Sequence, residues 1–205
     1  MSAVDGVTRG RIWVVASTGV LAALLFVACG GGSDDSARAP TSTLRPTGTA
    51  PTTSAAPQFR DVVPTASDFV NINTMTRVGD HFVGSLNGHL GAVLAVAHAP
   101  KDRAYPVGTV IQLIPTEAMV KRHAGYSPTT NDWEFFQLSV SPQGTVIRSS
   151  GARVKNFFGG DCASCHAAAA ARFDFVCEKN HGCAPLPFTA AQLASTQRGD
   201  PRPKR

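Results

Sequence analysis

The pentapeptide Cys162-Ala-Ser-Cys165-His166 constrains this chain more than any other feature of its sequence. In a helix, residues at positions i, i+3 and i+4 share one face, so both thiols and the imidazole would project from the same side. Asp161 is a typical helix N-cap, and the alanines after His166 favour helix. We therefore predict a helix over residues 161–172 with a chemically distinctive face.

This spacing is the attachment pattern of a c-type haem. The two thiols would form thioether bonds to a single porphyrin, and the imidazole of His166 would reach the iron. One covalently attached haem c is thus the expected cofactor. Zinc is the alternative, because C-x2-C is also a spacing of structural zinc sites and two later cysteines or His181 would complete the ligand set.

The N-terminus predicts export. Residues 12–27 are an unbroken apolar and small-residue run after Arg9 and Arg11. This run is shorter than the ~20 residues of a bilayer span and suits the apolar region of a signal peptide. Small residues before Cys29 resemble a bacterial lipobox, although Phe26 stands where that motif prefers Leu. We predict a lipoprotein signal peptide over 1–28 and lipidation of Cys29.

An ordinary secretory signal or a short anchor is the alternative to this lipoprotein signal. Gly30 follows Cys29 in place of the Asp associated with retention at the inner membrane. The expected location is therefore outside the cytoplasm, periplasm-facing or at the cell surface, on the bacterial outer membrane. The partner implied by the lipid is the membrane.

Composition divides the rest of the chain. Residues 29–58 are rich in Gly, Ser, Thr and Pro without apolar periodicity, which is typical of a flexible tether. Residues 59–190 then form one domain, and residues 191–205 are expected to be a basic, disordered tail. The net charge of +5 is mild, and no basic stripe with interleaved aromatic residues predicts nucleic-acid binding.

Within the domain, the apolar pattern over 82–97 predicts a helix. Strands are expected at 108–114, bounded by prolines, at 117–123, and in an antiparallel hairpin of 133–140 with 145–148. The order of these elements predicts an α+β fold, with a mostly antiparallel sheet packed with a few helices and a haem-attachment helix near its C-terminal end.

Two further cysteines, Cys177 and Cys183, enclose a short loop that contains Gly182. Unassigned cysteines in an exported domain most often pair. If Cys29 is acylated and two cysteines hold the haem, an even pair remains. We predict a disulfide between Cys177 and Cys183, which would fix the segment after the haem helix.

The chain resembles the cytochrome P-460 family, which includes the cytochromes c′-beta, over about residues 100–177. The resemblance rests on sequence features that occur in the family's order and spacing: Gly108-Thr-Val110 at the start of a strand, Met119-Val-Lys-Arg122, Gly125-Tyr126, Asp132-Trp-Glu-Phe-Phe136, the Gly144 turn, Cys162-Ala-Ser-Cys165-His166 and Asp174-Phe-Val176.

The resemblance implies a compact antiparallel sheet with one haem c, His166 as the proximal iron ligand, and often a homodimer. Members of the family bind nitric oxide, or oxidise hydroxylamine with a lysine cross-linked to the porphyrin. The matching position here is Leu113, which cannot form that cross-link, so enzymatic activity stays uncertain. An enzyme would have to use Lys121 or Glu117 on the distal side.

Further candidates for a distal ligand are Met119 and His89. A protein ligand there would favour electron transfer with a redox partner protein, and an open iron would favour binding of a small gas. The expected function is that of an exported, lipid-anchored monohaem cytochrome that transfers electrons or binds small ligands such as nitric oxide. The alternatives are an enzyme that converts hydroxylamine or nitrogen oxides, and a haem-free binding module stabilised by zinc or a disulfide.

Overall fold

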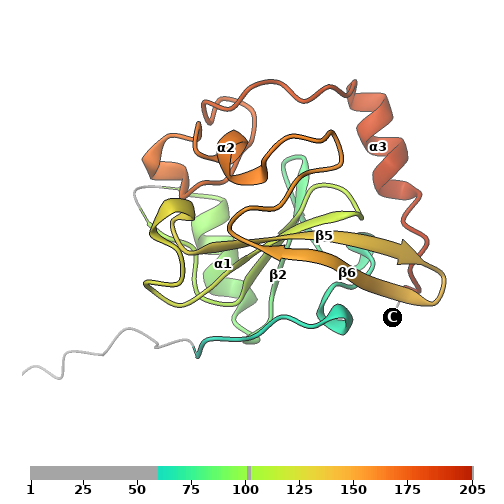
Figure 1. Ribbon diagram of the computed structural model, residues 1–205, viewed down its shortest axis with the longest axis horizontal. Coiled ribbons are helices and arrows are strands. Elements are labelled where there is room, and N and C mark those ends of the chain that lie inside the picture. The colour runs from blue at the N-terminus through green and yellow to red at the C-terminus, as the bar shows by residue number, and fades with distance from the viewer. Residues whose placement is uncertain (1–59, 101–102, 205) are drawn as a thin grey trace, which may run out of the picture. The chain divides into compact units, whose positions relative to one another are not determined.

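The computed structural model describes residues 60–100 and 103–204. The expected signal peptide, the tether and Cys29 lie outside the described residues. The described part has an α+β fold around a six-stranded sheet whose strands follow one another in chain order, β1-β2-β3-β4-β5-β6 (Figure 1). Every neighbouring pair is antiparallel. The predicted α+β class with a mostly antiparallel sheet is therefore confirmed.

The strands lie close to the predicted positions wherever turn residues bound them. β3 is rich in β-branched residues and lies between Pro106 and Pro115. β5 and β6 form the predicted hairpin, in which Ser141 pairs with Gly144. Gly144 has a φ of +130°, which favours glycine. The bounds are β1 Thr76–Val78, β2 His81–Ser85, β3 Thr109–Gln112, β4 Glu117–Lys121, β5 Trp133–Ser141 and β6 Gly144–Gly151.

Both predicted helices are shorter in the structure. The helix expected over 82–97 begins only at Leu90, because residues 81–85 form β2 and Val83 pairs with Ile111 of β3. The helix expected over 161–172 ends at His166. The amide of Ala170 donates to the carbonyl of His181 instead of continuing the helix, so a tertiary contact overrides the helix propensity of alanine.

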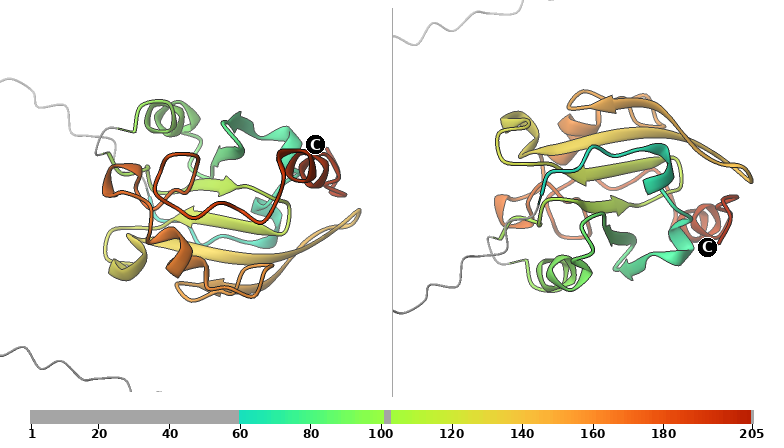
Figure 2. Two further views of the ribbon diagram at one scale, coloured as in Figure 1. Left: turned by 90° about the horizontal axis from the view of Figure 1, so that it is seen from above. Right: turned by 90° about the horizontal axis from the view of Figure 1, so that it is seen from below.

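The helices and 3-10 helices connect and cover the strands. α1 packs against the sheet through Val93 and Val96, which share a core cluster with Val83. Seen from above, the segment after α2 crosses over the strands to reach α3 (Figure 2, left). The bounds are α1 Leu90–Ala97, α2 Cys162–His166, α3 Ala190–Arg198, η1 Ala66–Asp68, η2 Ile72–Thr74, η3 Pro128–Thr130 and η4 Ala171–Phe173.

Successive side chains of a strand point to opposite faces of the sheet, so the buried apolar residues form two core clusters, one on each face. Met119 of β4 and its partner Phe135 of β5 face the same side as α1 and α2. Val120 and Phe136 face the opposite side, where Phe69 covers them. Each fully buried side chain of this size contributes about 1.5–3 kcal/mol to folding. The first of these faces is the one that carries the site described below.

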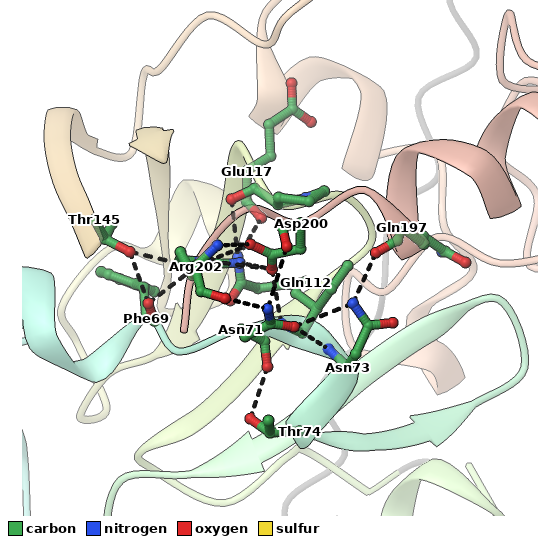
Figure 3. A network of polar contacts seen from close by, with 12 residues as sticks. Phe69, Asn71, Asn73, Thr74, Gln112, Glu117, Thr145, Gln197, Asp200 and Arg202 are labelled. Carbon is green, nitrogen blue, oxygen red and sulfur yellow. Dashed lines mark hydrogen bonds and ion pairs between the residues drawn. The ribbon is translucent and has the colours of Figure 1, made fainter. Parts of the chain in front are cut away.

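The expected disordered tail is wrong for the described residues beyond 190. α3 opens with a capping box between Thr189 and Gln192, and the side chains of Asp200 and Arg202 are 0% and 2% exposed. The Arg202 guanidinium donates to Asp200 and to the carbonyl of Phe69, at 2.6 and 2.9 Å (Figure 3). The side-chain amide of Asn71 donates to the carbonyl of Arg202 at 2.6 Å. Composition predicted a solvated tail, but the polar groups of Asp200 and Arg202 form hydrogen bonds with residues 69–72 near the start of the domain.

Acid is expected to weaken this C-terminal contact. Burial opposes ionisation of Asp200, but hydrogen bonds from Arg202 and from the amide of Ile72 outweigh it and hold the pKa of this carboxyl below its ordinary value. Because the folded pKa is depressed, the stabilisation is present above the unfolded pKa of about 3.9 and is lost as the pH falls through the folded value. Denaturant midpoints measured from pH 7 to pH 2.5 should fall, and Asp200→Asn should fall less steeply across the acidic range. An equal slope in both proteins would contradict this assignment.

Candidate functional site

A cavity of about 570 Å³ lies against the sheet face that carries Met119. Its wall on the sheet includes Ile111, Leu113, Met119 and Phe135, and the opposite wall comes from residues of α2 and of the segment 176–193. Cofactor and small-molecule sites typically occupy about 300–1,000 Å³ and are mostly apolar with a few placed polar groups. The cavity has that size and that character.

The helix α2 brings the predicted attachment residues to this cavity. Asp161 caps the helix, its carboxylate accepting from the amide of Ser164 at 2.8 Å. Cys162, Cys165 and His166 all line the cavity, as their spacing predicted. Neither Cys162 nor Cys165 is in a disulfide. Two unpaired thiols and an imidazole therefore share one cavity wall.

Burial also sets the state of the Cys162 thiol. Desolvation, with the negative charges of Glu117 and Asp161, raises the pKa of Cys162 to about 12. The thiol is therefore protonated in the folded domain at neutral pH and is a poor nucleophile there. Any bond to this sulfur forms more readily before the cavity closes around it.

His166 is oriented by a backbone carbonyl. Its Nδ1 lies 2.7 Å from the carbonyl oxygen of Phe175, and since a carbonyl only accepts, Nδ1 carries the proton. Burial lowers the pKa of His166 and outweighs the opposing effect of this hydrogen bond, so the ring is neutral at pH 7. Metal-binding histidines are commonly held in this way, with the second nitrogen left for the metal. The ring also packs 5.1 Å from that of Phe135.

The predicted disulfide is present: Cys177 and Cys183 are bonded, with their Cα atoms 5.7 Å apart. Gly182 in this loop has a φ of +108°, and a Cβ there would lie 2.7 Å from the carbonyl oxygen of Ala168. The loop therefore requires glycine at this position. The bond also removes both later cysteines from the zinc ligand set considered above.

His181, the other residue of that zinc alternative, does not line the cavity that holds Cys162 and Cys165. Its Nδ1 lies 2.7 Å from the carbonyl oxygen of Val176, and its ring stacks on Phe173 at 3.6 Å. Across residues 60–100 and 103–204, no group of three or more His, Cys, Asp or Glu side chains is arranged to hold a metal ion.

Two of the proposed distal residues line the cavity and two do not. Met119 is buried in its wall, and Glu117, two residues earlier on the same strand face, accepts a hydrogen bond from the amide of Phe157. Burial raises the pKa of Glu117. His89 precedes α1 as an exposed residue and is not among the lining residues.

Lys121 also lies outside the cavity lining. Its Nζ donates to Asp174 and to the carbonyl oxygen of Asn131, at 2.7 and 2.6 Å, and lies 5.1 Å from the centre of the Trp133 ring. Lys121 therefore has a structural role as one partner of a buried ion pair with Asp174. Leu113, the position where the resemblance would place a cross-linking lysine, does line the cavity.

The sequence analysis missed His81. This residue begins β2, lines the cavity and is 4% exposed. Its Nδ1 lies 3.3 Å from Glu178, another lining residue, and this contact lowers the pKa of the Glu178 carboxyl. His81 and Val83 are two residues apart, which places both on one face of a strand. This pattern was not recognised because residues 82–97 were interpreted as a helix.

Comparison of the chain with protein-family models, with curated proteins and with solved structures finds no match. Among the described residues, none of the helices has the length and apolar character needed to cross a membrane.

Proposed function

We propose that this protein is an exported, lipid-anchored monohaem c-type cytochrome that transfers electrons or binds a small ligand such as nitric oxide. One observation carries the proposal: Cys162, Cys165 and His166 come together on the wall of a single cavity of about 570 Å³. The free thiols, the apolar lining and the oriented imidazole fit a covalently attached porphyrin. In this proposal the cysteines hold the haem c and His166 binds the iron.

The protein's own contribution is to orient the imidazole and to exclude water. The carbonyl of Phe175 fixes the tautomer of His166, which sets the basicity of the nitrogen offered to iron. Apolar side chains such as Leu113, Met119 and Phe135 surround the site and lower its polarity. When bound, a haem supplies one-electron chemistry, and these surroundings tune its potential and its access to ligands.

The alternatives have less support. Hydroxylamine oxidation of the P-460 type would need a cross-linking lysine, but Leu113 occupies the matching position and Lys121 is paired with Asp174. A zinc module would use Cys177 and Cys183, which are joined in the disulfide, or His181, which lies outside the lining of the cavity that holds Cys162 and Cys165. Membership of the cytochrome P-460 and c′-beta group, a homodimer, and anchoring through Cys29 at the outer membrane remain part of the proposal on sequence grounds.

Haem staining of a denaturing gel tests the proposal directly. Full-length protein from a host with working cytochrome c maturation should give a coloured band, because thioether bonds survive detergent. The matched control is the Cys162→Ser, Cys165→Ser double variant, which keeps the size of the side chains and should be colourless at the same position. A colourless wild-type band from such a host would refute the proposal.

A further inference from the structure

His81 is the second histidine of the cavity. Its position opposite Val78 and two residues before Val83 places it on the sheet face that lines the cavity. His166 reaches the same cavity from α2. The two imidazoles thus come from different elements, one from the sheet and one from the covering segment.

The ring of His81 is buried without satisfying its polar atoms. It is 4% exposed, and within the described part of the chain its Nε2 has no partner. Its Nδ1 lies 3.3 Å from a carboxylate oxygen of Glu178, outside hydrogen-bonding geometry. Leaving such a buried polar group without a partner destabilises the fold through its desolvation. Native proteins leave few of these groups, and each points to a partner outside the polypeptide or to a functional role.

Both histidines of the cavity have an oxygen atom near Nδ1, as a hydrogen bond at His166 and as a longer contact at His81. An oxygen of Glu178 lies 3.3 Å from Nδ1 of His81, and the carbonyl oxygen of Phe175 lies 2.7 Å from Nδ1 of His166. A carboxylate or carbonyl oxygen at one ring nitrogen is the usual arrangement around a metal-binding histidine. Both residues therefore have Nε2 as the nitrogen left to bind a metal.

The other cavity residues show no comparable need for a partner. Glu117 already accepts a hydrogen bond from the amide of Phe157. Met119 is an apolar member of the core cluster at 4% exposure and has no polar group to satisfy. His81 is thus the cavity side chain outside α2 that most requires a ligand.

We propose that His81 would supply a second imidazole ligand to the haem iron, in addition to that of His166. This inference rests on the proposed function, since it presupposes the haem. It also narrows that function, because an iron ligated by two histidines favours electron transfer and leaves no free position for a small gas.

Absorption and electron paramagnetic resonance spectra test the inference on the full-length protein. The wild type should be low-spin with two histidine ligands in the oxidised state, and carbon monoxide should bind slowly to the reduced protein. His81→Ala should lose the low-spin signal and bind carbon monoxide at least tenfold faster, and added imidazole should restore the signal. His123→Gln, at an exposed residue outside the cavity lining, is the matched control and should keep the wild-type spectrum. Met119→Leu tests the competing ligand in the cavity wall and should keep the low-spin signal.

Several outcomes would overturn the inference while leaving the proposed function intact. These are a coloured, thioether-bound wild type that is high-spin, a low-spin signal that survives His81→Ala, and a low-spin signal lost in Met119→Leu. A protein without any haem stain would instead remove the proposed function, and the inference with it. If the His81→Ala protein does not accumulate, the electron paramagnetic resonance spectrum of the wild type still tests the inference. The spectrum of an iron bound by two histidines differs from that of an iron bound by histidine and methionine.

Discussion

If the proposed haem is bound, replacing His166 with Ala is expected to leave it covalently attached while removing the imidazole that would bind the iron. The thioether bonds depend on Cys162 and Cys165, so the intensity of haem staining per protein should stay near that of the wild type. The iron would lose the imidazole that the Phe175 carbonyl orients, so its ligand-dependent absorption bands should shift. Imidazole added in solution should reverse most of the shift.

His181→Ala is the matched control for this experiment. Its Nδ1 lies 2.7 Å from a backbone carbonyl, as that of His166 does, but the residue is outside the cavity lining. The control should therefore keep the wild-type absorption bands. An unchanged spectrum in His166→Ala would show that His166 does not bind the iron.

Arg202→Ala should cause a large loss of stability although Arg202 lies outside the cavity lining. Removing the guanidinium leaves the Asp200 carboxylate buried without its charged partner and removes the donor to the Phe69 carbonyl. Breaking a buried ion pair in this way typically costs about 3–5 kcal/mol. Since a domain of this size has about 5–15 kcal/mol in total, equilibrium denaturation should show a much lower midpoint.

Lys204→Ala controls for the loss of a basic residue in the same segment. Lys204 is exposed, so its removal should change the free energy of unfolding by less than about 0.5 kcal/mol. Equal stabilities of Arg202→Ala and the wild type would mean that residues beyond 198 do not pack on the domain in solution.

The sheet was predictable where local signals were strong. Prolines and β-branched residues delimited β3, and the turn at Gly144 fixed the β5–β6 hairpin, so these strands lie where the sequence placed them. The prediction for residues 82–97 was wrong because the apolar residues of this segment are compatible with two interpretations, a single helix or a strand followed by a helix. Only the pairing of Val83 with Ile111 distinguishes the two, and that contact is remote in sequence.

The candidate site was predictable to the extent that it depended on spacing. Cys162, Cys165 and His166 needed only a helical turn to meet, and the Cys177–Cys183 pair needed only a short loop. The place of His81 in the cavity could not be predicted in the same way, because it depends on strand register.

The C-terminal segment was misjudged for a related reason. Its basic, proline-rich composition is typical of solvated chain, and nothing local reveals that a buried carboxylate and a distant backbone carbonyl accept the protons of Arg202. Long-range polar pairing of this kind leaves no periodic signal in a sequence.

The hydrogen bond from Asn71 to Arg202 joins residues 131 positions apart, and it has a consequence for biosynthesis. A nascent chain that has already emerged past the Cys162–His166 pentapeptide cannot yet complete the contact, so its last packing step waits for residue 202. The segment 176–193, which lines the cavity opposite the sheet, also follows Cys162 in the chain, so the cavity around this sulfur is incomplete until that segment has emerged. If a haem is attached to this chain, the order in which the residues emerge would allow the attachment enzymes to reach Cys162 before the domain has folded completely.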